Sequence, residues 1–247
     1  MTLRTIYMFD VDGTLTPAKQ KIVASFAKQF AEWSKDKEVY LISGGSFIRI
    51  LEQVTPDLLD NMTAVYACMG NVCYKKKKDE PRAWVRSHEH SFEPPPGLTE
   101  ALDIVARDSE YTEKSPPHWE ARSGMINFSV IGQNATQTHR EEYGAYDELH
   151  QEREIIVKKL RPMFPEIDFV IGGAVSLDIF EKGRDKSQVI REHFKDLPKD
   201  AILHFVGDRV ESPGNDYAIA QSVKEYPNGH VHSVKSWKDT SKLLKSI

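Results

Sequence analysis

The sequence predicts an α/β protein whose main domain is a doubly wound parallel sheet interrupted by an inserted segment. Short apolar runs alternate with helical patterns over residues 5–68, and such alternation favours a parallel sheet. Proline and glycine then accumulate between residues 81 and 97, which is typical of a connector. A buried-strand pattern returns at residues 201–206, so the last part of the chain is expected to complete the first domain.

The elements of the first domain follow from hydrophobic periodicity and from the turn residues that interrupt it. Ser46 is placed to cap the helix that follows it. The expected strands are 5–9, 39–42, 63–68 and 201–206, and the expected helices are 21–33, a segment after Ser46, and one from about 237.

The inserted segment has a pattern of its own, and we place the boundaries so that the core is 1–81 with 186–247 and the insertion is 82–185. Its last strand alternates polar and apolar residues, as a half-buried strand does. The expected elements are helices at 98–106 and about 141–160, and strands at 125–131, 167–171 and 174–180.

Composition excludes several classes of function. The 247 residues carry 33 Lys and Arg against 37 Asp and Glu, so no basic excess points to nucleic acid or to an anionic membrane surface. The lysine run 75–78 has no aromatic platform beside it and is expected to be a solvated hairpin tip. No apolar run approaches a membrane span, and two cysteines are too few for a disulfide framework. We expect a cytoplasmic protein without a signal peptide.

Asp10 and Asp12 form the first candidate catalytic pair. Residues two apart at a strand end point to the same side, and Gly13 permits the turn that follows. One carboxylate can attack a phosphorus atom while the other moves a proton. The alternative is a polar strand end with an Asx turn. The strand–turn context favours Asp10 as nucleophile and Asp12 as general acid/base.

Such a site needs cations, because a carboxylate and a phosphate oxygen ~4 Å apart repel each other by on the order of 4 kcal/mol at an effective dielectric of ~20. Oxygen ligands favour Mg²⁺. We expect Asp10 and Asp12 to hold it together with Asp208, at the end of the late strand, and Asp216, after a Pro-Gly turn. The alternative for the distal pair is ordinary turn chemistry.

Lysine and small polar residues supply further candidates for phosphate binding. Lys186 precedes a helical segment and can screen the nucleophile and the phosphoryl group as a compact charge. Ser43 and Gly44 follow the second strand, where a hydroxyl and backbone amides can hold a phosphate oxygen. The alternatives are a solvated lysine and a simple turn.

These motifs, in this order, resemble those of the haloacid dehalogenase superfamily. A closer resemblance to eukaryotic-type phosphomannomutases covers most of the chain. The resemblance implies a Rossmann-like core with an inserted α/β cap. It also implies a mutase that interconverts mannose 6-phosphate and mannose 1-phosphate through a phospho-Asp10 intermediate and so feeds GDP-mannose synthesis. It also implies a hexose 1,6-bisphosphate activator and a homodimer formed through the cap. The matching segments are residues 9–17, 44–46, 122–127, 129–132, 172–173, 176–180, 183–186, 207–208 and 214–217.

The resemblance places sugar-phosphate contacts on Arg122, Arg140, Ser176 and Asp178. Arginines bind phosphate through two hydrogen bonds and keep their charge. Ser176 and Asp178 are two apart and share one face of their strand. Taken without the resemblance, the two arginines are ordinary surface residues and the strand is a simple half-buried one.

The chain departs from the family at two of its expected substrate-binding positions. Lys19 and Gln133 stand where the family has arginines, and Gln133 loses a charge-assisted contact worth ~1.5–3 kcal/mol. Cys68-Met69-Gly70 replaces the family's Glu-Asn-Gly. A weaker cap site favours the alternative function, a Mg²⁺-dependent sugar-phosphate phosphatase of the same superfamily. A binding protein with a vestigial site is disfavoured, because all four core motifs are intact.

Overall fold

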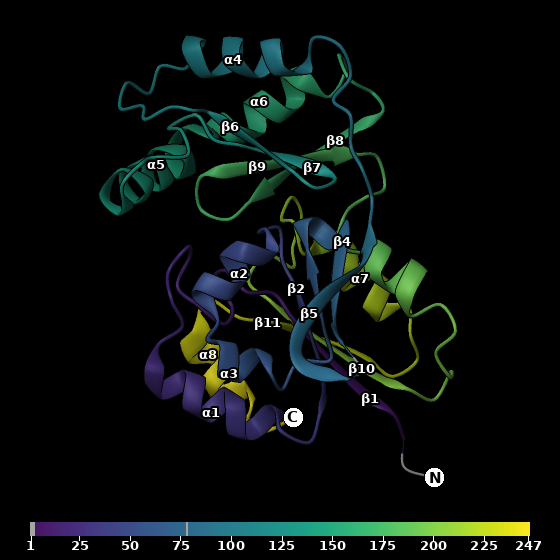
Figure 1. Cartoon of the computed structure of the whole chain (residues 1–247). Coiled ribbons are helices and arrows are strands. Elements are labelled where there is room, and N and C mark those ends of the chain that lie inside the picture. The colour runs from purple at the N-terminus through teal and green to yellow at the C-terminus, as the bar shows by residue number, and fades with distance from the viewer. Residues whose placement is uncertain (1–2, 78) are drawn as a thin grey trace.

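The computed structural model describes residues 3–77 and 79–247, and Figure 1 shows them as two α/β bodies. The lower body contains a seven-stranded sheet and the upper one a four-stranded sheet. The predicted fold class, a doubly wound core with an inserted α/β cap, is therefore confirmed. The chain leaves the core after β5 (Glu80–Glu89) and returns to it after β9 (Ser176–Glu181) (Figure 1).

The core sheet is built around β1, whose neighbours β10 and β2 both run parallel to it. The strand order is β11-β10-β1-β2-β3-β4-β5, and only the last two strands, β4 and β5, are antiparallel additions. Carboxyl ends of parallel strands meet at one edge, which is where α/β proteins bind ligands. The strands are β1 Thr5–Phe9, β2 Glu38–Ile42, β3 Ala64–Ala67, β4 Val72–Lys77, β5 Glu80–Glu89, β10 Ile202–Gly207 and β11 Gly229–Ser233.

The β4–β5 hairpin corrects the domain boundary expected at residue 81. β5 pairs antiparallel with β4 as far as Glu89, so residues 82–89 belong to the core sheet and the cap begins after them. A proline is a weak boundary signal here because an edge strand tolerates it. Of the lysine run 75–78, Lys75 to Lys77 end β4 beside the hairpin tip, and Lys78 lies outside the described residues.

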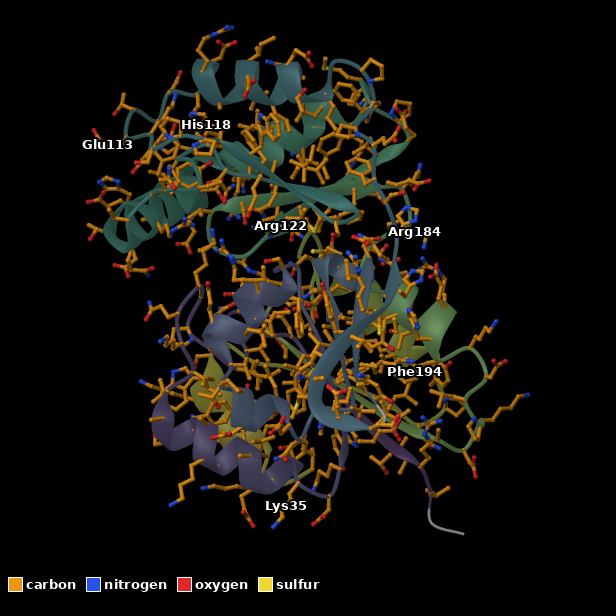
Figure 2. The ribbon with its side chains drawn as sticks, viewed as in Figure 1. Lys35, Glu113, His118, Arg122, Arg184 and Phe194 are labelled. Carbon is orange, nitrogen blue, oxygen red and sulfur yellow. The ribbon has the colours of Figure 1, made fainter. Side chains whose placement is uncertain are left out.

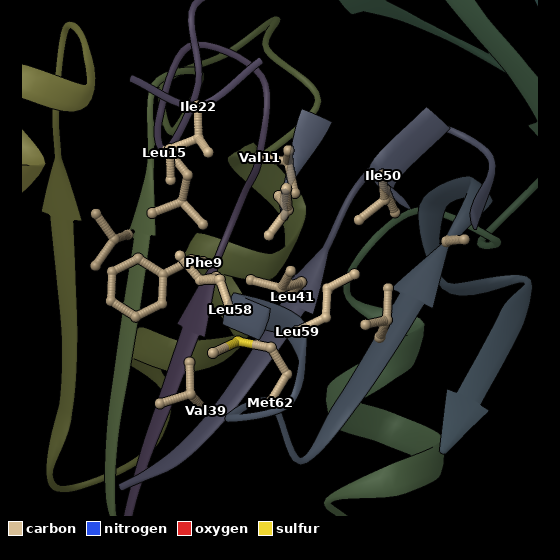
Figure 3. Packing of buried hydrophobic residues seen from close by; sticks show 14 of the residues in the cluster. Phe9, Val11, Leu15, Ile22, Val39, Leu41, Ile50, Leu58, Leu59 and Met62 are labelled. Carbon is tan, nitrogen blue, oxygen red and sulfur yellow. The ribbon is translucent and has the colours of Figure 1, made fainter. Parts of the chain in front are cut away.

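Helices cover both faces of the core sheet. Phe26 and Phe30 on α1 are buried, and the Phe30 ring meets the Phe9 ring edge-on at 5.1 Å between centroids. Figure 3 shows Phe9 and Leu41 within this apolar cluster. Ser46 caps α2 as expected, accepting a hydrogen bond from the Arg49 amide at 3.4 Å. The core helices are α1 Ala24–Ser34, α2 Phe47–Gln53, α3 Pro56–Leu59, α7 Tyr217–Lys224 and α8 Trp237–Leu243.

The cap is an antiparallel sheet, in the order β6-β7-β9-β8, with α4 and α6 over its outer face and the core below it (Figure 1). Met125, on β7, packs into the core cluster, so the two bodies share apolar contacts. The cap elements are α4 Leu98–Asp108, β6 Trp119–Arg122, β7 Met125–Phe128, α5 Gln137–His150, α6 Glu152–Leu160, β8 Ile167–Gly172 and β9 Ser176–Glu181.

The prediction of a single helix at about 141–160 is wrong, because the structure has two helices there, α5 and α6. Gln151 has a left-handed backbone (φ 53°) and separates α5 from α6. The buried Asp147 carboxylate holds this break by accepting the Arg153 amide at 2.8 Å and pairing with the Arg153 guanidinium at 2.7 Å. The break orients α5 separately from α6, and one side of α5 lines the cavity between cap and core.

Candidate active site

Asp10 lies at the carboxyl end of β1, where its amide still donates to the Val206 carbonyl of β10 at 3.0 Å. Lys186 is fully buried beside it. The Lys186 ammonium donates to Asp10 Oδ1 at 2.5 Å and to Asp216 Oδ1 at 2.7 Å. The structure therefore brings together three of the residues singled out in the sequence, from segments far apart in the chain.

Asp208 completes an acidic cluster with Asp10 and Asp216, because one carboxylate oxygen from each lies within 4.8 Å of the other two. Two glycines make this approach feasible. A Cβ at position 13 would lie 2.5 Å from Asp208 Oδ2, and one at position 207 would lie 2.5 Å from Asp216 Oδ2. A larger residue at either position would displace a carboxylate.

The electrostatics of this cluster fit a divalent cation. Burial raises the pKa of Asp10 well above its usual range, and Asp216 and Asp208 add to the rise while Lys186 opposes it. Burial and Asp216 raise the pKa of Asp208 to about 7. Burial would lower the pKa of Lys186, but Asp10 and Asp216 outweigh it and raise it. Lys186 pairs with Asp10 and Asp216, and Arg209 Nε lies 3.7 Å from Asp208 Oδ2, so two cations face three carboxylates. Oxygen ligands of this kind suit Mg²⁺.

Asp12 stands apart from the acidic cluster, although the sequence predicts it as a fourth metal ligand. Its Oδ1 accepts the Lys19 backbone amide at 2.6 Å and the Gln53 side-chain amide at 2.8 Å. Both Asp12 and Asp10 line the same cavity. The Asp12 carboxylate is thus held in the cavity wall by two donors, and it is not one of the three clustered acids.

A cavity of about 400 Å³ lies between core and cap and contains most of the predicted site. From the core it is lined by Asp10, Asp12, Lys19, Ser43, Gly44 and Asp208, and from the cap by Arg122, Arg140, Ser176 and Asp178. Six polar lining residues were not assigned to the site from the sequence, namely Arg49, Asn127, Gln137, Glu141, Glu148 and Asn215. A polar residue at the first turn of a helix that follows a Gly-Gly loop is the signal that could have identified Arg49.

Four cationic side chains gather in this cavity, namely Lys19, Arg49, Arg122 and Arg140. Arg122 lies at the junction of cap and core in Figure 2, where it pairs with Glu120 at 2.7 Å and donates to the Gly44 carbonyl at 3.0 Å. Arg140 donates to two backbone carbonyls, while its Nη1 is buried without a partner among the described residues. Such a cluster is suited to an anion.

Gln133 is not among the residues that line the cavity, which corrects its predicted role in substrate binding. Its amide nitrogen donates to the backbone oxygen and to Oδ1 of Asn127, at 3.2 Å each. Its Oε1 is buried without a hydrogen-bond partner among the described residues. Gln133 therefore orients Asn127, which does line it.

Asp178 is held from both domains. Its Oδ1 accepts the side-chain amide of Asn127, on β7 of the cap, at 2.9 Å. Its Oδ2 accepts the side-chain amide of Asn215, on the core loop that carries Asp216, at 3.1 Å. Ser176 donates to the Gly172 carbonyl at 3.0 Å. The Asp178 carboxylate is 3% exposed and has no cationic partner among the described residues, so it presents acceptor oxygens to the cavity.

The loop after β2 is fixed by the turn at 68–70, where three successive residues have positive φ (50°, 63° and 95°). The Cys68 amide donates to the Gly45 carbonyl and the Met69 amide to the Ser43 carbonyl, both at 2.9 Å. Non-glycine residues in this conformation are strained and persist only where their surroundings impose it. Burial raises the pKa of the Cys68 thiol to about 12, so the thiol is unreactive.

Comparison with known proteins agrees with this geometry. The model of the family described as eukaryotic phosphomannomutase matches residues 26–247. The chain belongs to that family. The phosphomannomutase of Saccharomyces cerevisiae is 32% identical over 98% of this chain and 94% of its own length, and that of Galdieria sulphuraria is 34% identical over 98% and 94%.

Solved structures extend the likeness to the wider superfamily. A haloacid dehalogenase-like hydrolase from Bacteroides thetaiotaomicron superposes with a TM-score of 0.57 at 12% identity, covering 98% of both chains. At this identity the likeness concerns the fold alone. The chain is thus an enzyme of the phosphomannomutase type on a haloacid dehalogenase-like fold. Phosphomannomutases of this family use Mg²⁺, and the acidic cluster matches that use. Among the described residues, no helix is long and apolar enough to cross a membrane.

Lys19 should give this enzyme a pH dependence that an arginine would not. Burial, with help from Arg140, Arg49 and Arg122, lowers the pKa of Lys19 to about 7. Lys19 is therefore charged below pH 7 and loses its charge above it. We expect KM for a sugar phosphate to rise about fivefold to tenfold between pH 7 and pH 8, as charge-assisted binding is lost. The Lys19→Arg variant should show a flat KM over this range.

Steady-state kinetics at half-unit pH steps test this expectation. The substrate phosphate is already a dianion above pH 7, so its own titration does not produce the rise. Identical KM profiles for the wild type and Lys19→Arg would contradict the assignment.

Proposed function

We propose that this chain is a phosphohexomutase that interconverts mannose 6-phosphate and mannose 1-phosphate, supplying the latter for GDP-mannose synthesis. One observation carries the proposal. A single cavity joins the Asp10 carboxylate to a separate group of four cations. The acidic end, where bound Mg²⁺ would offset the carboxylates, suits the phosphoryl group that is transferred, and the cationic end suits a second phosphate that is not transferred.

Phosphoryl transfer is assigned to Asp10 and Asp12. Lys186 holds Asp10 Oδ1, which leaves Oδ2 to attack a phosphorus atom of the hexose bisphosphate. The phosphorus–oxygen bond to the sugar breaks, Asp12 gives its proton to that oxygen, and phospho-Asp10 forms. Asp12 then takes the proton of the sugar hydroxyl that attacks phospho-Asp10, and it returns a proton to the leaving oxygen in the reverse step. Mg²⁺, for which Asp10, Asp208 and Asp216 are the proposed ligands, would neutralise phosphate charge when bound. Ser43 and Gly44 are placed to bind the oxygens of the transferred group.

The cap provides the second half of the proposed reaction. Arg122 and Arg140 are assigned to the phosphate that is not transferred, and Ser176 and Asp178 to the sugar hydroxyls. A hexose 1,6-bisphosphate activator would load phosphate onto Asp10 and must bind in both orientations. Contacts such as that from Arg122 to the Gly44 carbonyl keep the cap closed, which protects phospho-Asp10 from water.

The decisive experiment supplies mannose 1-phosphate, Mg²⁺ and catalytic glucose 1,6-bisphosphate, and follows mannose 6-phosphate and free phosphate together. The proposal expects mannose 6-phosphate to form faster than phosphate. Predominant release of phosphate would overturn it and establish the alternative, a sugar-phosphate phosphatase. A cap-mediated homodimer, a cytoplasmic location and the lack of nucleic-acid or membrane partners stay predictions, which size-exclusion chromatography and fractionation can test.

A further inference from the structure

Arg49 is the cation of the cavity that neither the sequence motifs nor the family resemblance assigns. It is the third residue of α2, directly after the Ser43–Ser46 loop, and the Ser46 cap fixes the start of that helix. Its side chain lines the cavity from the core side. Within residues 3–77 and 79–247, its guanidinium has no hydrogen-bond or ion-pair partner. Arg122, by contrast, is paired with Glu120.

Arg49 lies close to the other cations. Its charge acts on both Lys19 and Arg140 and lowers the pKa of each, in addition to the larger effect of burial. Asp12 and Glu120 offset part of this positive charge. An anion bound in the cavity would compensate the remainder. In the same region, Nη1 of Arg140 is buried without a hydrogen-bond partner among the described residues.

The position of Gln133 makes the cation of Arg49 more important for binding an anion in the cavity. Gln133 is neutral, its amide nitrogen hydrogen-bonds to Asn127, and it does not line the cavity, so that part of the cap contributes no third cation. Arg49 approaches from the core, opposite α5, which carries Arg140. The chain therefore has a four-cation site, with two cations on the core and two on the cap.

We propose that Arg49 binds the non-reacting phosphate of the sugar phosphate, together with Lys19, Arg122 and Arg140. This inference rests on the proposed function, in that it assumes a substrate with a second phosphate position. It makes that phosphate a bridge between the domains, because its ligands come from α2 and the Lys19 loop on one side and from β6 and α5 on the other. Substrate binding then adds to the contacts that hold the cap against the core.

The first test compares Arg49→Gln with Arg49→Lys and with a control, Arg107→Gln, whose side chain on α4 is 73% exposed. Losing one charge-assisted contact should raise KM for mannose 1-phosphate about 10-fold to 100-fold. Turnover of p-nitrophenyl phosphate, which has only a reacting phosphate, should change less than about twofold. Arg49→Lys should recover part of the affinity, because it restores the charge without the planar fork. An unchanged KM, or equal losses on both substrates, would overturn the proposal.

A second measurement separates this inference from the mutase assignment. Calorimetry measures the affinity for glucose 1,6-bisphosphate of the Asp10→Asn variant and of the double variant Asp10→Asn, Arg49→Gln. The measurement does not require either protein to catalyse the reaction. Weakening by about 10-fold or more in the double variant supports Arg49 as a phosphate ligand even if the wild type releases only free phosphate. Equal affinities of the two proteins would reject Arg49 as a phosphate ligand even if the wild type proves to be a mutase. Failure of both proteins to bind glucose 1,6-bisphosphate would reject it as well.

Discussion

Asp10→Asn should abolish isomerisation, lowering kcat by on the order of 10⁴-fold or more, because an amide cannot form the phosphoenzyme. The loss should not come from misfolding. Asn has the same shape, and its side-chain oxygen can still accept from Lys186, as Asp10 Oδ1 does at 2.5 Å. Circular dichroism and a thermal melt should therefore show a folded protein, while acid-quench trapping should detect no phosphoenzyme.

Asp57→Asn is the matched control, since Asp57 is an exposed acid in the first turn of α3. It should keep wild-type kcat. Residual Asp10→Asn activity above about one hundredth of wild type, with no return to Asp by deamidation, would show that another group receives the phosphate.

Lys186→Met should have the largest effect on stability, lowering the free energy of unfolding by about 3–5 kcal/mol. Lys186 is fully buried and is the shared partner of Asp10 and Asp216, both almost fully buried themselves. Removing it leaves carboxylates in a site of low polarity without their compensating charge. Urea denaturation of the wild type and the variant, in buffer without divalent cations, measures the difference.

Mg²⁺ should partly restore the stability of Lys186→Met, since a cation that binds only the folded state stabilises it in proportion to its occupancy. The stabilisation by Mg²⁺ should be larger in the variant than in the wild type, because the variant retains all three clustered acids without the ammonium. Lys158→Met, at a side chain that is 74% exposed, should unfold like the wild type with or without Mg²⁺. No response to Mg²⁺ in Lys186→Met would argue against the acidic cluster as the metal site.

The core could be predicted from sequence wherever one local rule decided the structure. Residues 5–9 and 39–42 are apolar enough to be buried on both faces, so their run length alone identifies them as strands. Ser46 precedes a helical pattern and caps it. The positions of Asp10 and Asp208 followed in turn, because strand ends in a parallel sheet meet at one edge.

Long-range contacts account for what local rules missed. The break at Gln151 depends on the buried Asp147–Arg153 pair, whose burial no periodicity reveals. The reach of the core sheet to Glu89 depends on pairing between β4 and β5. The separation of Asp12 from the acidic cluster depends on hydrogen bonds from Lys19 and Gln53. Sequence spacing gives the side of a strand on which a side chain lies but not its partners.

The two amides that hold Asp178 have a consequence for selectivity between sugars. Asn127 moves with the cap and Asn215 with the core, so an opened molecule would lose one of the two hydrogen bonds that fix this carboxylate. With Asp178 as the proposed ligand of a sugar hydroxyl, epimers would be told apart only in the closed complex. Both epimers would then bind the open molecule at similar rates. The wrong epimer would fail to hold the cap closed and would dissociate faster, so the selectivity between epimers would lie in the dissociation rate.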